Sequence, residues 1–457
     1  MTEATMGRRE RKKARTRQAI ADAALELFLE RGYDQVSVKD VAEAADVSTS
    51  GLFKHFPTKE SLVFDRDDDI RAALVSAVRD RPEGVPPLDA LRDWRLARLR
   101  ERSADPRTAA FAELVTSTPA LQDYADRMWL DHERELAQAL TETEPQAPAP
   151  DDSPRGGPDA STPQTDATTQ TDLGAQAHDP AQTDDTAWPD VAARTDHAAR
   201  AEVAARAVAR FALDRLRPRG QDDPRRVIEA AFTLLANGWP APELSRPASD
   251  RAPAVARSAA PAGPPGLRER KKAQTRRAII EAAVALFTER GYDNVGVREI
   301  ADAADTSIAT LFKYFPDGKV SLVFPGDRAA RIASLTDAVH DRAPGQTVLD
   351  ALRGLLSQRG PFKEDPTPAE QRVLDLVSAT PDLRDYALRS WTNGQDALAA
   401  AIAEESGLPA DDLTARLLAR YVLQIPDLAR NTPDPRRTLD IVIDLLSRGW
   451  PACLHES

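Results

Sequence analysis

The stretch RERKKARTRQAIADAALELFLERGYDQVSVKDVAEAADVSTSGLFKHFP, residues 9–57, decides the fold because the chain carries it twice. The second copy, RERKKAQTRRAIIEAAVALFTERGYDNVGVREIADAADTSIATLFKYFP, covers residues 268–316 at an offset of 259, and 31 of the 49 aligned positions are identical. Similarity resumes downstream, where TPALQDYADRMW (118–129) matches TPDLRDYALRSW (380–391). The motif DPRR…GWPA also occurs near the C-terminal end of each copy, at residues 223–241 and 434–452. The repeat predicts a chain of 457 residues built from one unit written twice.

The first part of each repeat predicts a helix followed by a tight turn. In copy one, apolar residues at helical spacing from Ile20 to Phe28 predict a helix that ends at Arg31. Gly32 follows it, at the position where a helix most often ends on glycine. No alternating strand pattern occurs in the chain, and the fold class predicted is all-α.

The second part of each repeat predicts two short helices joined by about three residues. Ser37 and Asp40 have the spacing of a capping box at the start of one helix. Ser48 caps the next, in which Leu52, Phe53 and Phe56 are expected to point into the core. Two such helices in sequence are typical of a helix-turn-helix, whose second helix enters the major groove of DNA.

The offsets between the copies place the boundaries of the chain. Copy one carries about fifty extra residues, near 141–190, that are rich in Pro, Thr, Gln and Asp and predict a disordered acidic insert. The units expected are a first helix-turn-helix domain (8–64), a first helical ligand-binding and dimerisation domain (65–241), a linker (242–266), a second helix-turn-helix domain (267–324) and a second helical domain (325–452).

The net charge of −12 argues at first against binding to nucleic acid. The insert, however, holds eleven acidic residues against Arg155, a net charge of −10, so that −2 remains elsewhere. By contrast, residues 8–17 have a net charge of +6 and residues 268–277 a net charge of +5. The two basic runs precede both helix-turn-helix motifs and are expected to contact phosphates.

Other classes of protein are disfavoured by composition. The single cysteine, Cys453, excludes an intramolecular disulfide, and together with His455 it is expected to lie in a frayed C-terminal tail. No long apolar run predicts a membrane span, and a cytoplasmic location is expected. The scattered histidines predict no metal site, and no cofactor motif is present.

At these residues the sequence resembles the TetR family of bacterial transcriptional repressors. The tract AALELFLERGYDQVSVKDVAEAADVSTSGLFKHFPTKESL is similar to that family's DNA-binding domain, and AAVALFTERGYDNVGVREIADAADTSIATLFKYFP is similar to a second one. The resemblance implies a ligand-responsive regulator that binds double-stranded operator DNA. It further implies pairing of two units through their last two helices, in a four-helix bundle, and an effector that lowers DNA affinity.

The resemblance also implies which side chains face DNA. Those expected to contact bases are Lys39, Thr49, Ser50 and Gly51 in copy one and Arg298, Ile308, Ala309 and Thr310 in copy two. Those expected to contact phosphates are Arg9, Arg11, Lys12, Lys13, Ser37, Lys54, His55 and Lys59, with Arg268, Arg270, Lys271, Lys272, Lys313, Tyr314 and Lys319 in copy two. Since the base-facing residues differ, the heads are expected to bind two non-identical half-sites.

Two departures in copy two bear on its DNA affinity. Gly296 stands where copy one has the capping Ser37, a change worth a few tenths of a kcal/mol. One extra residue in Pro316-Asp317-Gly318 shifts Lys319 along the chain. A partner-binding regulator with a weakened second head is therefore one alternative, and an enzyme with an unrecognised site is another.

The effector site is predicted less sharply. The expected effector is largely apolar, because the candidate pocket residues are aromatic. The candidates are Trp94, Phe111, Tyr124, Trp129, Tyr386 and Trp391.

The pairing expected is an intramolecular pseudo-dimer, in which helices near 198–216 and 225–235 pack on helices near 412–428 and 436–446. A linker of about 25 residues spans about 28 Å as a coil and about 85 Å when stretched. Half-sites one helical turn apart are about 34–36 Å from each other, within that reach. Assembly of several chains stays open.

Overall fold

The computed structural model describes residues 7–105, 107–143, 188–214, 222–239, 267–324, 328–430 and 432–454. For residues 188–195, 267–269 and 328 it describes the backbone only. Within these ranges every regular element is helical, which confirms the all-α prediction. The predicted linker and most of the predicted insert lie outside the described residues, and the domain boundaries stay predictions.

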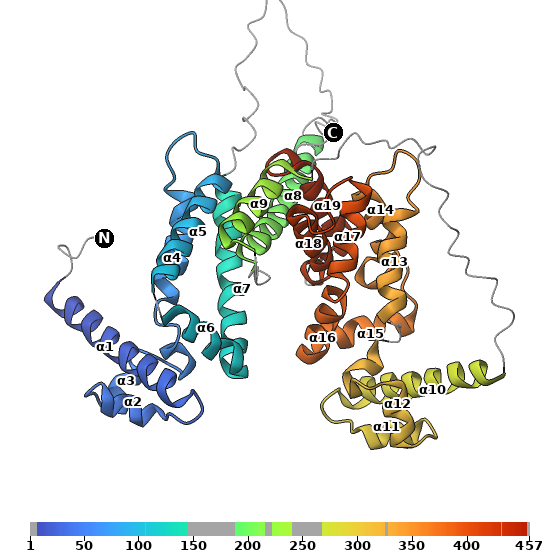
Figure 1. The fold of residues 1–457 in the computed structure, drawn as a ribbon, viewed down its shortest axis with the longest axis horizontal. Coiled ribbons are helices and arrows are strands. Elements are labelled where there is room, and N and C mark those ends of the chain that lie inside the picture. Colours follow the sequence, from blue (N-terminus) through green and yellow to red (C-terminus); the bar gives the residue numbers. More distant parts are fainter. Residues whose placement is uncertain are drawn as a thin grey trace, which may run out of the picture.

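Within the described residues, copy one contributes nine α-helices, drawn from blue to green in Figure 1. They are α1 (Arg8–Arg31), α2 (Val38–Ala44), α3 (Thr49–Phe53), α4 (Asp67–Arg79), α5 (Pro87–Ala104), α6 (Arg107–Ser117), α7 (Pro119–Glu142), α8 (Trp188–Leu213) and α9 (Pro224–Asn237). The first helix ends at Arg31 as predicted, and Gly32 follows with a φ of 82°.

Copy two repeats this order with ten α-helices in its described part, drawn from yellow to red. They are α10 (Leu267–Arg290), α11 (Val297–Ala303), α12 (Ile308–Tyr314), α13 (Arg328–His340), α14 (Val348–Leu356), α15 (Pro368–Ala379), α16 (Pro381–Thr392), α17 (Gln395–Glu405), α18 (Leu413–Ala429) and α19 (Pro435–Arg448). The long helix α7 corresponds to α16 and α17 together. The break falls at Asn393-Gly394, where glycine disfavours an uninterrupted helix.

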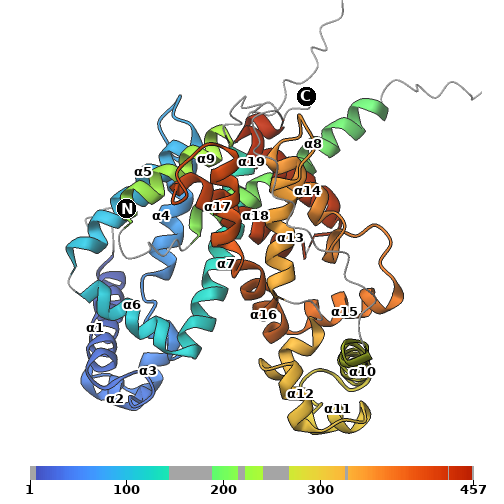
Figure 2. The ribbon, with the colours of Figure 1, turned by 45° about the vertical axis from the view of Figure 1, so that its right-hand side comes forward.

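Three hydrophobic cores hold the molecule together. One joins α1–α3 to α6 and α7, and one joins α10–α12 to α15 and α16, so each helix-turn-helix head packs on the helical domain of its own copy. The third is continuous through both copies and includes Leu136 and Phe211 of the first with Leu398 and Tyr421 of the second. Figures 1 and 2 show the two heads at the same end of the molecule, below this shared core.

The two copies meet at a surface that we call the seam. There α8 and α9 of copy one pack on α18 and α19 of copy two. Two backbone hydrogen bonds cross it: the N–H of Trp239 donates to Leu446 O at 2.6 Å and that of Trp450 donates to Leu235 O at 2.8 Å. Beside them Gly238 and Gly449 bring the two backbones into direct contact. The seam therefore pairs equivalent segments of the two copies.

Side chains also pair across the seam, through a ring stack of equivalent residues and through ion pairs that are not repeated symmetrically. The rings of Phe211 and Tyr421, which occupy equivalent positions, stack with centroids 4.3 Å apart. Arginines bind carboxylates of the other copy in the pairs Arg420–Asp214, Arg416–Asp222, Arg210–Asp427 and Arg200–Asp444. Because these pairs are mostly shielded from solvent, breaking one would leave a charge in a poorly hydrated place.

The predicted frayed C-terminus is wrong for Cys453. Its side chain is fully buried, and its carbonyl oxygen accepts a 2.7 Å hydrogen bond from Arg200 Nε. The short 3₁₀ turn Ala452–Leu454 folds back onto α8 and so extends the seam. His455 lies outside the described residues.

Candidate nucleic-acid interface

The helix-turn-helix of copy one is built by side-chain caps. Ser37 Oγ accepts from the N–H of Asp40 at 3.2 Å, and the Asp40 carboxylate accepts from the N–H of Ser37 at 2.8 Å, which confirms the predicted capping box. Ser48 Oγ accepts from the N–H of Gly51 at 3.0 Å and starts α3. Asp46 takes a φ of 52° in the turn between α2 and α3. These contacts define where α2 and α3 begin and shape the turn that joins them.

The residues predicted to contact bases in copy one lie on this head. The Lys39 side chain is 77% exposed and pairs with Glu43 at 3.6 Å. Thr49 and Ser50 are exposed at the start of α3, while Gly51 is half-buried. A Cβ at Gly51 would come within 3.1 Å of Ser48 Oγ, so glycine there leaves the cap undisturbed.

Copy two forms the same motif with a less polar surface. Arg298, Ile308 and Ala309 are exposed. Thr310 is half-buried, and its hydroxyl lies 2.8 Å from the hydroxyl of the capping Ser307. The head therefore presents mainly an arginine and two apolar side chains.

The prediction that Phe53 points into the core is wrong, and the equivalent Phe312 is exposed as well. Phe53 is 48% exposed and Phe312 45% exposed, whereas their neighbours Leu52 and Leu311 are fully buried. Leucine and phenylalanine are adjacent in both copies, and apolar character alone does not say which of the two faces the core. An exposed phenylalanine beside base-facing residues can contact a thymine methyl group.

The basic run of each copy lies in the first turns of the first helix of that copy. Arg9, Arg11, Lys12 and Lys13 lie exposed in the first turns of α1. Their counterparts Arg270, Lys271 and Lys272 lie exposed on α10. For Arg268 the structure describes the backbone only. A helix fixes the spacing of these cations along a phosphate backbone.

Of the other predicted phosphate contacts, Lys54 and Lys313 are exposed at the end of α3 and in α12. The hydroxyl of Ser37 donates to Asp40 at 2.7 Å. The His55 and Tyr314 side chains are half-buried. Burial, together with the charges of Lys13 and Arg17, lowers the pKa of His55, so its imidazole is neutral at neutral pH.

Lys59 and Lys319 occupy equivalent places although copy two has one residue more. Each ammonium lies 4.0 Å from the ring centroid of a tyrosine, Tyr33 for Lys59 and Tyr292 for Lys319. Gly318, with a φ of 72°, absorbs the extra residue, so the shift expected from the sequence does not displace the side chain. Burial lowers the pKa of both ammonium groups.

Two arginines of the basic runs expected to contact phosphates also pack against the residues that end or follow the second helix of each helix-turn-helix. Arg17 lies 4.3 Å from the ring centroid of Phe56 and donates to His55 O at 2.5 Å. Arg276 lies 4.7 Å from the ring of Phe315 and donates to Tyr314 O. Their presence at the same position of both copies was the signal available in the sequence.

The six aromatic residues predicted to line an effector pocket pack among other side chains. Trp94, Trp129 and Trp391 pack against the shared core, and Phe111 and Tyr124 lie around Phe64. Tyr386 donates a 2.9 Å hydrogen bond to Asp317. None of them lines the cavity between α8 and α19, and their role toward an effector stays a prediction.

Within the described ranges no helix is both long and apolar enough to cross a membrane. A family model described as "Bacterial regulatory proteins, tetR family" matches residues 20–65 and 279–324, which are the two heads. A second, described as "MftR C-terminal domain", matches residues 346–429.

Three relatives each match about a third of this chain or less. The HTH-type transcriptional repressor KstR of Rhodococcus jostii is 31% identical over 161 residues, 35% of this chain and 68% of its own length. The transcriptional regulator MftR of Mycobacterium tuberculosis is 26% identical over 156 residues, 34% of this chain and 78% of its own. The HTH-type transcriptional regulator TcmR of Streptomyces glaucescens is 40% identical over 85 residues, 19% of this chain, and the match spans 38% of its own length.

Proposed function

Because the chain belongs to the TetR family of bacterial transcriptional regulators, with that family's DNA-binding domain present twice, we propose that one chain binds one operator through both heads. In this proposal the chain is an intramolecular pseudo-dimer, and a small-molecule effector releases it from DNA. It acts in the cytoplasm as a repressor and has no catalytic step.

The observation that carries this proposal is the seam. Its paired backbone hydrogen bonds and the Phe211–Tyr421 stack join equivalent segments of the two copies, as a two-fold interface joins two subunits. The core beneath it is continuous through both copies. Tethering holds the two units at an effective concentration of about millimolar, so pairing does not depend on protein concentration.

The arrangement of the heads supports a single operator. Both lie at the same end of the molecule, with α2 and α3 of one and α11 and α12 of the other farthest from the seam (Figures 1 and 2). Two heads on one side can reach successive major grooves on one face of a duplex.

The mass of the DNA complex tests the proposal. Light scattering on the purified full chain with a duplex selected from a random pool should give one chain of 49.8 kDa per duplex. Binding that appears only in a species with two or more chains would contradict the pseudo-dimer.

The operator itself should be an imperfect palindrome. Head one presents the hydroxyls of Thr49 and Ser50, whereas head two presents Ile308, which suits thymine methyl groups. Each wrong base pair costs about 1–3 kcal/mol, so we expect the full chain to prefer the hybrid site over either perfect palindrome by about 10-fold or more.

The chain supplies its own control for this prediction. The quadruple substitution Lys39→Arg, Thr49→Ile, Ser50→Ala and Gly51→Thr gives head one the predicted base-facing residues of head two. The preferred duplex should then become the palindrome of the second half-site, as measured by fluorescence anisotropy. Equal affinity of the unaltered chain for all three duplexes would refute the asymmetry.

The effector in this proposal is a small molecule, largely apolar, held within a helical domain. Its test is the operator affinity of the full chain in the presence of candidate compounds, with Trp94→Leu and Trp391→Leu as variants at the predicted pocket.

A further inference from the structure

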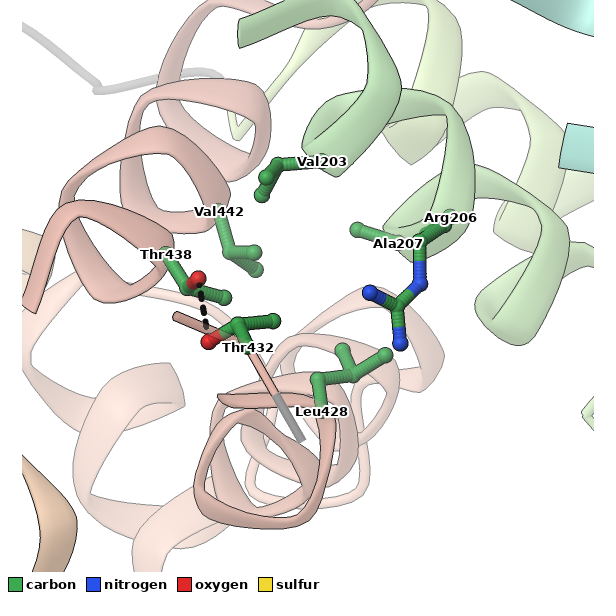
Figure 3. A pocket seen from close by; sticks show the side chains of 7 residues that line it. All are labelled: Val203, Arg206, Ala207, Leu428, Thr432, Thr438 and Val442. Atoms are coloured by element: carbon green, nitrogen blue, oxygen red, sulfur yellow. Dashed lines mark hydrogen bonds between the residues drawn. The ribbon is translucent and has the colours of Figure 1, made fainter. Parts of the chain in front are cut away.

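The seam encloses a small cavity between the two copies. Figure 3 shows three side chains of α8 facing four side chains from the end of α18, the turn after it and α19; they are Val203, Arg206 and Ala207 on one side and Leu428, Thr432, Thr438 and Val442 on the other. The cavity has a volume of about 10 Å³, near the space of one water molecule, and is open on one side. It is thus large enough for one oxygen-sized group.

The equivalent place on the other side of the seam is filled by a carboxylate. Arg416 occupies in copy two the position that Arg206 has in copy one, at an offset of 210. Arg416 binds Asp222 with two hydrogen bonds, Nη2 to Oδ1 at 2.8 Å and Nη1 to Oδ2 at 3.0 Å. Counted from the stacked rings of Phe211 and Tyr421, Thr432 stands where copy one has Asp222.

Differences between the copies explain why the cavity is open. Val203 and Ala207 replace the larger Leu413 and Leu417 of the equivalent position, and Thr432 has no carboxylate to extend toward Arg206. The volume therefore lies where the other side of the seam has two leucines and an aspartate. A void of this kind in a packed interface loses contacts that the opposite side retains.

The wall of the cavity carries one charge. Arg206 is half-buried, and within the described part of the chain it makes no ion pair or hydrogen bond through its side chain. The hydroxyls of Thr432 and Thr438 lie 2.9 Å apart and already have acceptors in Ala429 O and Asp434 O. Arg206 is thus the group available to an anion, and a guanidinium binds a planar carboxylate best.

We propose that this cavity receives one oxygen of the carboxylate group of a small organic acid, which Arg206 holds as Arg416 holds Asp222. The bound group connects α8 of copy one with α18 and α19 of copy two and so strengthens the seam. That its binding changes operator affinity rests on the proposed function, whereas its binding alone does not.

The test uses thermal unfolding of the full chain in sodium acetate at constant ionic strength, with acetamide as the neutral analogue. Acetate should raise the Tm of the unaltered chain by about 2–4 °C more than that of Arg206→Leu, and acetamide should not. An equal response of the two proteins to acetate would overturn the proposal.

A tethered carboxylate gives a second test that needs no added acid. Thr432→Asp places in the cavity the group that Asp222 provides on the other side, and we expect its Tm to exceed that of the isosteric Thr432→Asn by about 2–4 °C. This gain should vanish when Arg206→Leu is added. If Thr432→Asp is no more stable than Thr432→Asn, the cavity does not accept a carboxylate.

The equivalent site supplies the matched control. Asp222→Thr removes the natural carboxylate from Arg416, so acetate should restore part of the stability that this variant loses. Restoration there without any response of the unaltered chain would rule out the cavity as a site. Operator affinity measured with and without acetate then separates the two proposals: stabilisation with unchanged affinity would leave the site standing and remove its role in regulation.

Discussion

Replacement of Gly238 by alanine should lower operator affinity by about 100-fold or more, because it separates the two copies at their closest approach. A Cβ at this position would lie 2.3 Å from Ser447 O and 2.6 Å from Arg448 N, both of them backbone atoms. Gly238 also has a φ of 73° and a ψ of 179°, a region open almost only to glycine. Together the strained backbone and the clash should cost about 2–6 kcal/mol.

The chain offers a control with nearly the same backbone. Gly32 follows α1 with a φ of 82° and a ψ of 152°, and a Cβ there would meet no atom within 4 Å. Gly32→Ala therefore carries the conformational cost without the clash. Urea unfolding should show a much larger loss for Gly238→Ala, and the equivalent Gly449→Ala, with Ala236 O at 2.3 Å, should match it. Equal losses for Gly32→Ala and Gly238→Ala would contradict the close approach.

The second large effect is expected at Asp214. Its carboxylate accepts from Arg420 Nη2 at 2.7 Å and from Gln424 Nε2 at 3.0 Å, and its side chain is 10% exposed. Asp214→Ala leaves the Arg420 guanidinium unpaired in the seam, which should lower the free energy of unfolding by about 3 kcal/mol. Urea unfolding of the full chain measures this loss.

Two comparisons isolate the charge. The double variant Asp214→Leu with Arg420→Leu should recover most of the stability, because an apolar pair needs no desolvated charge. Asp89→Ala breaks the more exposed pair with Arg92 within α5 and should cost less than about 1 kcal/mol. A loss at Asp214 no larger than that at Asp89 would mean that the seam does not depend on this ion pair.

Local signals predicted the heads well. The Ser37–Asp40 capping box and the helix end before Gly32 depend on neighbours within a few residues, and the structure confirms both. The exposure of Phe53 was missed because Leu52 and Phe53 are adjacent and equally apolar, and only the tertiary packing of α3 decides which is buried.

Individual contacts between residues far apart in sequence could not be predicted. Cys453 is buried in the seam, where its carbonyl oxygen accepts a hydrogen bond from Arg200, 253 residues away in sequence. The cavity beside Arg206 lies where Val203 and Ala207 are smaller than the leucines at the equivalent positions, and such a difference is visible only once the seam aligns the copies. The contacts with bases and phosphates stay predictions, because they form only in a complex with DNA.

Fusion changes how this interface can evolve. In a homodimer a single codon change alters both sides of the two-fold axis, so every new side chain appears twice in the interface. Here Arg200 faces Asp444, while the equivalent positions hold Ala410 and Thr233. The complementary pair is therefore present once and is not duplicated. The same freedom applies to the recognition helices, so selection can retune one half of the operator while the other half keeps its sequence.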